Sequence, residues 1–270
     1  MIRPISDPQV FRDFLPAFRG DPLFSEPMLF TPEQLRCNLL EPLSSPWHRV
    51  LGVWKGEELT GLFSFLILPE ERYLEMLVGL SRDADAYGEI ADWLQEACSG
   101  FHADFVFNPR NPLLRALLEQ KGASFDPEQQ RMAFSGPPPE LDTAGVEPLS
   151  AQNRAQYEAI HNRDVYWTGD KVAEATDRFR ALVAMEGEAA AGYLDVTYGD
   201  EENEIYDLLV LESRRRRGWG RKLLAKAMAP GDRLMLMVDV DNAPAIALYR
   251  SLGFETVPGQ NSLTATWQIP

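Results

Sequence analysis

The sequence has few residues of the kinds that bind metals or form disulfides. Its 270 residues include two cysteines and three histidines. Cys37 and Cys98 show neither the spacing of a metal site nor that of a disulfide framework, so we expect two buried free thiols. His48, His102 and His161 are scattered along the chain and predict no metal site.

Apolar runs long enough to cross a membrane are also absent. No stretch approaches the ~18 apolar residues of a transmembrane helix, and Met1-Ile2-Arg3-Pro4 does not begin a signal peptide. With 45% hydrophobic residues the chain can bury a core, and its length suggests about two domains. These features predict a cytoplasmic protein without a membrane partner, and they leave its oligomeric state open.

Basic residues are outnumbered. The chain has 26 lysines and arginines against 41 aspartates and glutamates, a formal net charge of −15, and both halves share the excess of acid. A nucleic-acid-binding protein would present a basic face, so we expect no nucleic-acid partner. The acidity permits a cationic, amine-bearing substrate, although solubility explains it equally well.

The basic residues that are present gather in one stretch. Glu204–Val210 reads as a buried strand, and a helical pattern with an apolar face runs on to Met228. Between them lies Arg214-Arg215-Arg216-Arg217-Gly218-Trp219-Gly220-Arg221. Glycines let a backbone turn tightly around a ligand. Unpaired N–H groups at a helix start favour an anion, and arginines add charge-assisted contacts. The stretch therefore predicts a phosphate-binding turn, against the plain alternative of a charged helix start.

The spacing Arg215-x-x-Gly218-x-Gly220 excludes two common phosphate loops. A Walker loop would continue with Gly-Lys-Ser/Thr, and the dinucleotide fingerprint needs a third glycine where Leu223 stands. Downstream, a predicted strand at 233–240 leads into a helix with the run N-x-x-A-I-A-L-Y-x-S-L-G-F. Asn242 is a suitable N-cap for this helix, and Gly253 is a suitable residue to end it.

These two segments resemble, in order and register, the two CoA-binding motifs of the GCN5-related N-acetyltransferase (GNAT) superfamily. The resemblance covers roughly residues 140–270. It implies an α/β fold with a mixed, mostly antiparallel central sheet flanked by helices. It also implies transfer of an acetyl group from acetyl-CoA, as co-substrate and without a metal, to an amine that attacks the thioester directly.

The resemblance assigns the cofactor contacts by position. The backbone of Leu208, Leu209 and Val210 would meet the pantetheine arm, and Asn242 would also contact the cofactor. The pyrophosphate would be held by the loop and the first turn of the helix: Arg215, Arg216, Arg217, Gly218, Trp219, Gly220 and Arg221.

The same resemblance indicates the catalytic residues. Tyr249 matches the tyrosine that donates a proton to the leaving thiolate in many members, although a tyrosine on an apolar helix face is often only core. Free alkylamines are mostly protonated at pH 7, so a base is required. Some relatives place a glutamate where Met237 stands here, which excludes that version. Glu204 has the spacing seen in histone-type members but is equally a solvated strand start. Asp239 or a chain of waters stay open as alternatives.

The sequence repeats itself. Three pairs of turn and cap residues stand 131 residues apart: Gly56 and Gly187, Asn111 and Asn242, Gly122 and Gly253. An equal offset at three separated points indicates a repeat of domain size. Before the first of these points the pattern predicts helices at 7–19 and 31–43. The three prolines of Ser135–Glu140 then interrupt every pattern, as in a stiff linker.

We therefore expect two tandem acyl-CoA N-acyltransferase-like domains: 1–134, a linker at 135–145, and a catalytic domain at 146–270. At the offset of 131 the first half has Ala84-x-x-Tyr87-x-Glu89 in place of the glycine loop, with Asp83 and Asp85 nearby. Carboxylates at that place would repel a pyrophosphate. The first domain is thus predicted to be a degenerate copy without a CoA loop, which covers the second domain and helps to wall a substrate cleft.

The acceptor is the least defined part. The loop His161–Thr168 joins two predicted helices where the family usually shapes its acceptor pocket. Asp164, Tyr166 and Trp167 could hold a cation there by charge and ring-face attraction, or could be ordinary packing. We expect a small-molecule amine. The alternatives are another acyl-CoA donor, a thiol-linked amine as in tandem mycothiol synthase relatives, and a non-catalytic CoA sensor or partner-binding protein.

Overall fold

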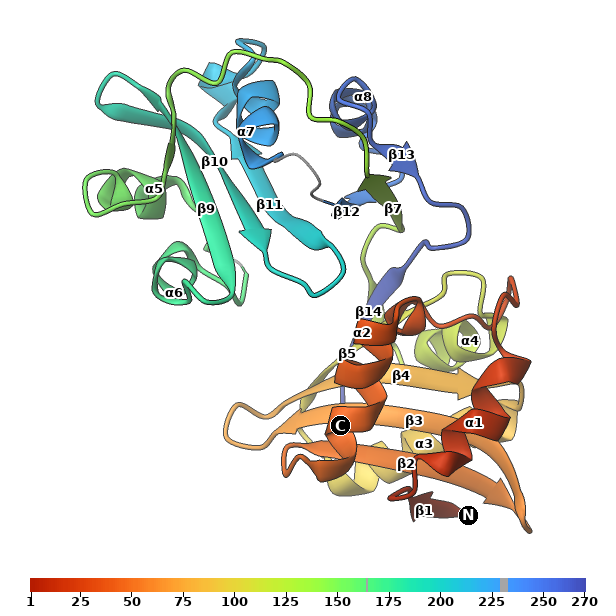
Figure 1. Cartoon of the computed structure of the whole chain (residues 1–270). Coiled ribbons are helices and arrows are strands. Elements are labelled where there is room, and N and C mark those ends of the chain that lie inside the picture. Colours follow the sequence, from red (N-terminus) through yellow and green to blue (C-terminus); the bar gives the residue numbers. More distant parts are fainter. Residues whose placement is uncertain (164, 229–232) are drawn as a thin grey trace. The chain divides into compact units, whose positions relative to one another are not determined.

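The computed structural model describes residues 1–163, 165–228 and 233–270. The chain divides into two compact units, each built on one seven-stranded sheet (Figure 1). Unit 1 comprises residues 1–130 and 258–270, and unit 2 comprises residues 131–257. Among the described residues, no helix has the length and apolar character needed to span a bilayer.

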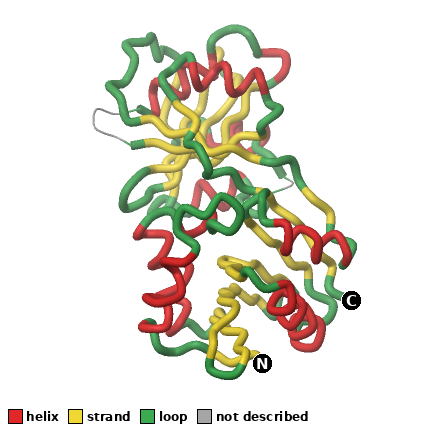
Figure 2. The backbone as a smooth tube through the Cα atoms, turned by 90° about the vertical axis from the view of Figure 1, so that its right-hand side faces the viewer, coloured by secondary structure: helices red, strands yellow, loops and turns green. Residues whose placement is uncertain are grey.

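Unit 1 has the strand order β1-β2-β3-β4-β5-β14-β6, antiparallel except for the parallel pair β4 and β5. Its strands are β1 (Ile2–Pro4), β2 (His48–Lys55), β3 (Glu58–Leu68), β4 (Tyr73–Ser81), β5 (His102–Phe107), β6 (Ser124–Phe125) and β14 (Leu263–Gln268). Its helices are α1 (Gln9–Phe14), α2 (Pro32–Leu35), α3 (Ala84–Ala97) and α4 (Pro112–Gln120), with short turns η1 (Leu15–Ala17), η2 (Pro27–Leu29), η3 (Arg36–Leu40) and η4 (Glu41–Ser44). Helices cover both faces of this sheet (Figure 2), which gives two cores, one under α3 and α4 and one under α1.

Unit 2 repeats this plan with the order β13-β7-β12-β11-β10-β9-β8. Its strands are β7 (Gln129–Phe134), β8 (Val146–Pro148), β9 (Phe179–Glu186), β10 (Ala189–Thr197), β11 (Asn203–Val210), β12 (Leu234–Asp239) and β13 (Glu255–Thr256). Its helices are α5 (Arg154–Ile160), α6 (Gly169–Glu174), α7 (Trp219–Ala227) and α8 (Ala243–Arg250), with the turn η5 (Glu212–Arg214). One core lies under α7 and α8, and the other lies under α5 and α6.

The last strand of each repeat lies in the sheet of the other unit. β6 and β13 begin 131 residues apart, at Ser124 and Glu255, so they are equivalent strands. The strand that follows each of them crosses over: β7 lies between β12 and β13, and β14 lies between β5 and β6. The C-terminal strand is therefore part of the core of unit 1. There the ring centroids of Trp267 and Phe105 lie 6.4 Å apart.

The two units differ at two points from the boundaries expected from the sequence. Residues 258–270, expected in the second domain, belong to unit 1, and the first unit's early segment ends at 130 rather than at 134. The predicted helices at 7–19 and 31–43 are also shorter. α1 ends before Pro16, which lacks the N–H that an α-helix needs, and the chain continues as the 3₁₀ turn η1. α2 ends at Leu35 and continues as the π-helical turn η3, which the 3₁₀ turn η4 follows.

The exchanged strand gives a test. Trp267→Ala should remove about 3–5 kcal/mol from the stability of unit 1, because the ring is 3% exposed within that core. Hydrogen exchange followed by mass spectrometry should show faster exchange in β5 and unchanged exchange in β12. The neighbouring exposed Gln268→Ala is the control and should change little. Loss of protection in β12 instead would contradict the assignment of the last strand to unit 1.

Candidate functional site

Two neighbouring parallel strands of unit 2 diverge. Among the described residues, β11 pairs with β12 only at Asn203–Leu234 and Glu204–Met235. Beyond Glu204, β11 is paired only with β10, and Tyr206 is the extra residue of a β-bulge. Leu208, Leu209 and Val210 therefore lie half-buried along an open strand edge (Figure 1). Such an edge offers backbone N–H and C=O groups to an extended ligand.

The loop after β11 leads to an open helix start. Residues 211–218 connect β11 to α7, and Gly218 is the N-cap with φ of +85°. Gly218 carries no capping side chain, so the first N–H groups of α7 have no side-chain acceptor there. Arg216 also has a positive φ of +65°, rare for a residue with a side chain and typical of strained functional loops. The predicted phosphate-binding turn is thus an uncapped helix N-terminus.

Side chains around this turn are partly engaged by the protein. Arg214 and Arg217 pair with Glu186, and Arg221 donates to the Ser251 hydroxyl at 3.1 Å. Arg215 donates to the carbonyl of Val210 at 3.2 Å, whereas Arg216 has no recorded partner in the described part of the chain. All three of Arg215, Arg216 and Arg217 are exposed. The loop thus keeps a net positive charge next to the open N–H groups.

The second glycine and the tryptophan have packing roles. A Cβ at Gly220 would lie 3.1 Å from Leu248 of α8, so this glycine lets the two helices approach closely. The Trp219 ring packs into the core of unit 2 against Gly145. Trp219 and Gly220 therefore face the turn with their backbones rather than with side chains.

The equivalent helix of unit 1 is closed. β4 is joined to α3 by residues 82–83 alone, and the N-cap is Asp83, whose carboxylate accepts from the N–H of Asp85 at 3.0 Å. Lys55 pairs with Asp83 at 2.7 Å and so neutralises that carboxylate. The N-caps Asp83 and Gly218 correspond, so the offset of 131 that aligns Tyr87 with Gly218 does not hold across this loop. The longer connection of unit 2 changes the register.

The diverging strands of unit 1 are also filled. β4 and β5 pair only from Tyr73 to Met76 of β4, and the segment η2 packs against both strands. From that segment the buried Glu26 accepts the N–H of Gly79 at 3.1 Å. On the other side the Tyr87 hydroxyl donates to the Gly79 carbonyl at 3.1 Å. Protein side chains thus occupy the strand edge that is open in unit 2.

Burial changes the chemistry of this filling. It raises the pKa of Glu26 to about 8, although the Gly79 and Met28 amides pull the pKa down.

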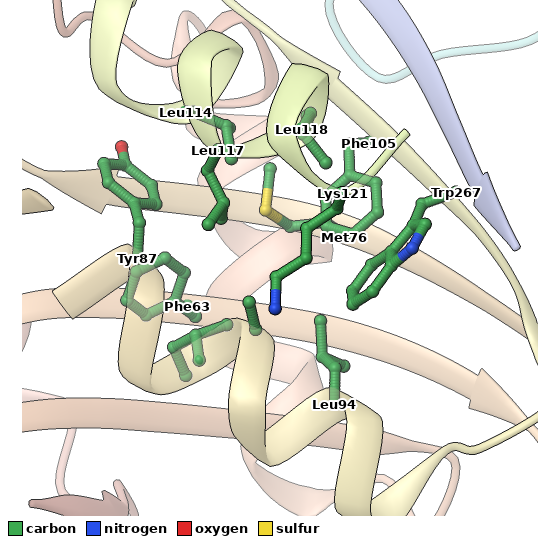
Figure 3. A pocket seen from close by; sticks show the side chains of 12 residues that line it. Phe63, Met76, Tyr87, Leu94, Phe105, Leu114, Leu117, Leu118, Lys121 and Trp267 are labelled. Atoms are coloured by element: carbon green, nitrogen blue, oxygen red, sulfur yellow. The ribbon is translucent and has the colours of Figure 1, made fainter. Parts of the chain in front are cut away.

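Between α3, α4 and the sheet, apolar side chains surround a small cavity (Figure 3), whose volume is about 10 Å³. Lys121 and Trp267 close one side of this cavity (Figure 3). It is too small for more than a single water molecule.

Tyr249 lies on α8, 8% exposed, with its ring 5.8 Å from that of Phe254. Burial and the nearby charge of Asp207 raise the pKa of Tyr249 to about 12. Its hydroxyl has no recorded hydrogen bond among the described residues, so a phenol that stays protonated at neutral pH is free to donate. Asn242 caps α8 through its Oδ1, which accepts from the N–H of Ala245 at 3.2 Å.

Glu204 lies where β11 and β12 separate. Burial raises its pKa, and the charges of Arg131 and Arg178 oppose this shift. A raised pKa suits a group that must take up a proton near neutral pH. Asp239, the other carboxylate considered from the sequence, is the last residue of β12.

The residues expected to bind the acceptor are spread out. Asp164 lies outside the described residues. Tyr166 is 59% exposed, with the Lys171 ammonium 4.0 Å from its ring centre. The Trp167 ring packs on Phe179 and has the Arg178 guanidinium 4.8 Å from its ring centre. One cation of the chain itself already faces each of these two rings.

The structure brings together a polar cluster that the sequence analysis did not recognise. The Nε2 atom of the buried His161 lies 2.9 Å from Asp195, which also accepts from the Tyr157 hydroxyl at 2.8 Å. On the adjacent strand, Asp207 accepts from the Tyr193 hydroxyl at 2.7 Å. The pattern that could have revealed it is an aspartate in the middle of each apolar strand, since a buried charge needs a partner.

This cluster is also the one group of three possible metal ligands in the described part of the chain. Ligand atoms of His161, Asp195 and Asp207 lie within 4.8 Å of one another. However, each of the three side chains already has a hydrogen-bond partner within the cluster. The hydrogen bonds account for the arrangement without an ion.

The open helix start beside diverging strands, in a chain with two such sheets, defines the fold: two tandem acyl-CoA N-acyltransferase-like units. Within this fold, residues 146–254 match the family model of the acetyltransferase (GNAT) family. This segment contains both of the motifs whose resemblance to the family the sequence showed. No curated protein matches the sequence.

Solved structures share the fold at low identity. A GCN5-related N-acetyltransferase from Sphaerobacter thermophilus is 16% identical, with 82% of this chain and 80% of that chain covered and a TM-score of 0.61. A tandem GNAT protein from the clavulanic acid biosynthesis pathway is 14% identical, covering 100% and 98%, with a TM-score of 0.59. A Drosophila protein is 15% identical, covering 98% of each chain, with a TM-score of 0.59. The predicted mixed α/β fold with tandem domains is confirmed.

The filling of unit 1 predicts a pH-dependent stability. The pKa of the Glu26 carboxyl rises on folding. Its protonated form therefore stabilises the folded state at pH values below the ordinary pKa of glutamate, and this contribution is lost as the pH rises through about 8. The free energy of unfolding of the wild type should therefore fall by a few kcal/mol between pH 5 and 9. Glu26→Gln should flatten this fall in urea titrations, and the exposed Glu57→Gln should not. Parallel curves for wild type and Glu26→Gln would contradict the buried carboxyl.

The open helix start predicts a second outcome, for the acetyl-CoA that this family normally uses. Gly218→Asp should place a negative charge beside the first N–H groups of α7, where it repels a pyrophosphate, and aspartate tolerates the positive φ of this position. Calorimetry should then show at least a 100-fold loss of acetyl-CoA affinity with circular dichroism unchanged. Gly56→Asp, at a turn glycine with φ of +63°, controls for backbone strain and should bind normally. Unchanged affinity of Gly218→Asp for acetyl-CoA would show that this turn does not bind the pyrophosphate.

Proposed function

We propose that unit 2 transfers an acetyl group from acetyl-CoA to the primary amine of a small molecule by direct attack of the amine on the thioester. The observation that carries the proposal is the uncapped start of α7 beside the diverging edge of β11, within a GNAT-family domain. Unit 1 has the same two features closed by its own side chains. One chain thus contains the site and its filled counterpart.

The residues of the open site fit acetyl-CoA. The backbone edge of Leu208–Val210 would hold the pantetheine arm, which needs alternating donors and acceptors. The N–H groups of Trp219, Gly220 and Arg221 and the arginines at 215–217 would hold the pyrophosphate. Asn242 would contribute its amide nitrogen, which has no recorded partner among the described residues. In unit 1 the corresponding nitrogen of Asn111 donates to the Tyr87 hydroxyl at 2.9 Å.

Acetyl-CoA supplies an acetyl thioester, and the chain supplies proton transfers. We assign Tyr249 as the donor to the departing thiolate, because burial keeps its hydroxyl protonated and no side chain in the described part of the chain engages it. Glu204, where the strands separate, is the base predicted from the sequence, and its raised pKa supports that role. In unit 1, Leu118 corresponds to Tyr249, so that unit lacks the donor.

Release of CoA thiol with a panel of amines tests this function. Acetyl-CoA with spermidine, glucosamine or lysine should give CoA release above hydrolysis, with the acetylated amine detected by mass spectrometry. Binding of acetyl-CoA without release for any amine would instead favour a CoA-binding sensor. Release with a longer acyl-CoA but not with acetyl-CoA would change the donor and keep the mechanism.

Tyr249→Phe separates catalysis from binding. Loss of the proton donor should lower kcat by about 10²–10³-fold, while the dissociation constant for acetyl-CoA changes less than about twofold. Steady-state kinetics and calorimetry measure the two quantities. Tyr198→Phe, at an exposed tyrosine, is the matched control. Wild-type turnover in Tyr249→Phe would remove this hydroxyl from the reaction.

A further inference from the structure

The His161 cluster forms one continuous network between α5 and β11. Its links are the His161–Asp195 and Tyr193–Asp207 contacts and the backbone of Asn162. The carbonyl of Asn162 lies 2.9 Å from His161 Nδ1, and its N–H donates to the Tyr193 hydroxyl at 3.2 Å. The rings of His161 and Tyr193 are stacked at 4.5 Å. The network is therefore rigid and fixes the direction of the Tyr193 hydroxyl.

Hydrogen-bond roles fix the protons of this network. A carbonyl only accepts, so Nδ1 of His161 must carry a proton. Nε2 and Asp195 then share one further proton. Burial lowers the pKa of His161, but its bonds to Asp195 and Asn162 and the charges of Asp195 and Asp207 outweigh burial and raise it. The His161–Asp195 pair is thus neutral as a whole.

Asp207 is the carboxylate of this network that has no cationic partner among the described residues. Among the described residues it has no ion pair, and its recorded hydrogen bond is the one that Tyr193 donates to Oδ2. It is half-buried on β11, next to the bulge at Tyr206 and three residues after Glu204. Its charge also acts on Tyr249 across the diverging strands. A half-buried carboxylate without a cation is costly, so this position suits a cationic ligand.

We propose that Asp207, in place of the sequence-predicted Glu204, binds the cationic nitrogen of the acceptor and takes the proton that this nitrogen must lose before attack. Tyr193, His161 and Asp195 are positioning residues that hold the Asp207 carboxylate. The proposal rests on the proposed acetyl transfer, and it names the acceptor class: amines that are positively charged in solution.

The atoms balance. An alkylammonium gives one proton to Asp207, which passes it to solvent, and the neutral nitrogen bonds to the thioester carbonyl carbon. The bond between that carbon and sulfur breaks, and Tyr249 protonates the leaving thiolate. The second proton that the nitrogen loses as the amide forms restores the tyrosine. The products are the N-acetylated amine, CoA and one proton.

Two acceptors of similar size and different charge test the proposal. Benzylamine is protonated at pH 7, whereas aniline is neutral and needs neither a carboxylate partner nor prior deprotonation. Asp207→Asn should lower kcat/KM about 100-fold for benzylamine and less than about threefold for aniline. Glu188→Gln, at an exposed turn of the same unit, is the control and should leave both values unchanged. Glu204→Gln tests the other candidate base. Tyr193→Phe should lower the benzylamine value alone, by about tenfold.

Other outcomes overturn the proposal. An equal loss for both amines in Asp207→Asn would show a structural defect, and a selective loss in Glu204→Gln alone would make Glu204 the base. Binding of benzylamine to the enzyme–CoA complex, measured by calorimetry, should weaken at least tenfold in Asp207→Asn while the affinity for CoA stays constant. This readout needs no turnover. If the wild type transfers no acetyl group, the proposed function fails and the binding measurement still decides the role of Asp207.

Discussion

The N–H groups that open α7 are the constraint on which the site depends. A helix start must satisfy these donors, and proteins usually do so with a side chain at the N-cap. Here the N-cap is a glycine in a left-handed conformation, and the loop before it contains a strained arginine. Without a capping side chain, these donors remain available to an anion. The same position in unit 1 carries Asp83, which removes the site.

The two units differ in few side chains at these corresponding positions. Both sheets have a parallel pair that diverges after a short contact, and both have a helix start beside the divergence. In unit 1, Glu26 and Tyr87 satisfy the N–H and C=O of Gly79, so the strand edge is closed from both sides. The fold alone therefore does not create a cofactor site. The site requires that the chain leave its own backbone groups unpaired.

The sequence predicted those parts of the molecule that depend on local chemistry. Caps and turns such as Asn242 and Gly187 obey steric rules over a few residues, so their positions and the offset of 131 could be read directly. The exchanged strands could not be placed in this way, because β14 shows an ordinary alternating pattern that does not state which sheet it joins. Register across the loop 211–218 was misplaced for a similar reason, since an insertion leaves no local mark.

The buried cluster around His161 and Asp195 could not be recognised from the sequence, because it depends on contacts between distant segments. Asp195 is fully buried, and its partners come from outside its strand: Tyr157 lies on α5, and His161 is the residue that follows this helix. A lone histidine and a lone aspartate, 34 residues apart, do not form a motif. Only the packing of α5 on the sheet brings the two side chains within hydrogen-bond distance.

The proposed acetyl transfer at neutral pH needs an acid and a base at one site. A proton donor to the thiolate has to remain protonated while a nearby carboxylate remains ionised. Burial and the charge of Asp207 raise the pKa of Tyr249, so the carboxylate itself helps to keep the phenol protonated. Tyr193 stabilises the Asp207 carboxylate by donating a hydrogen bond to it. The negative charge of Asp207 thus disfavours ionisation of the Tyr249 hydroxyl.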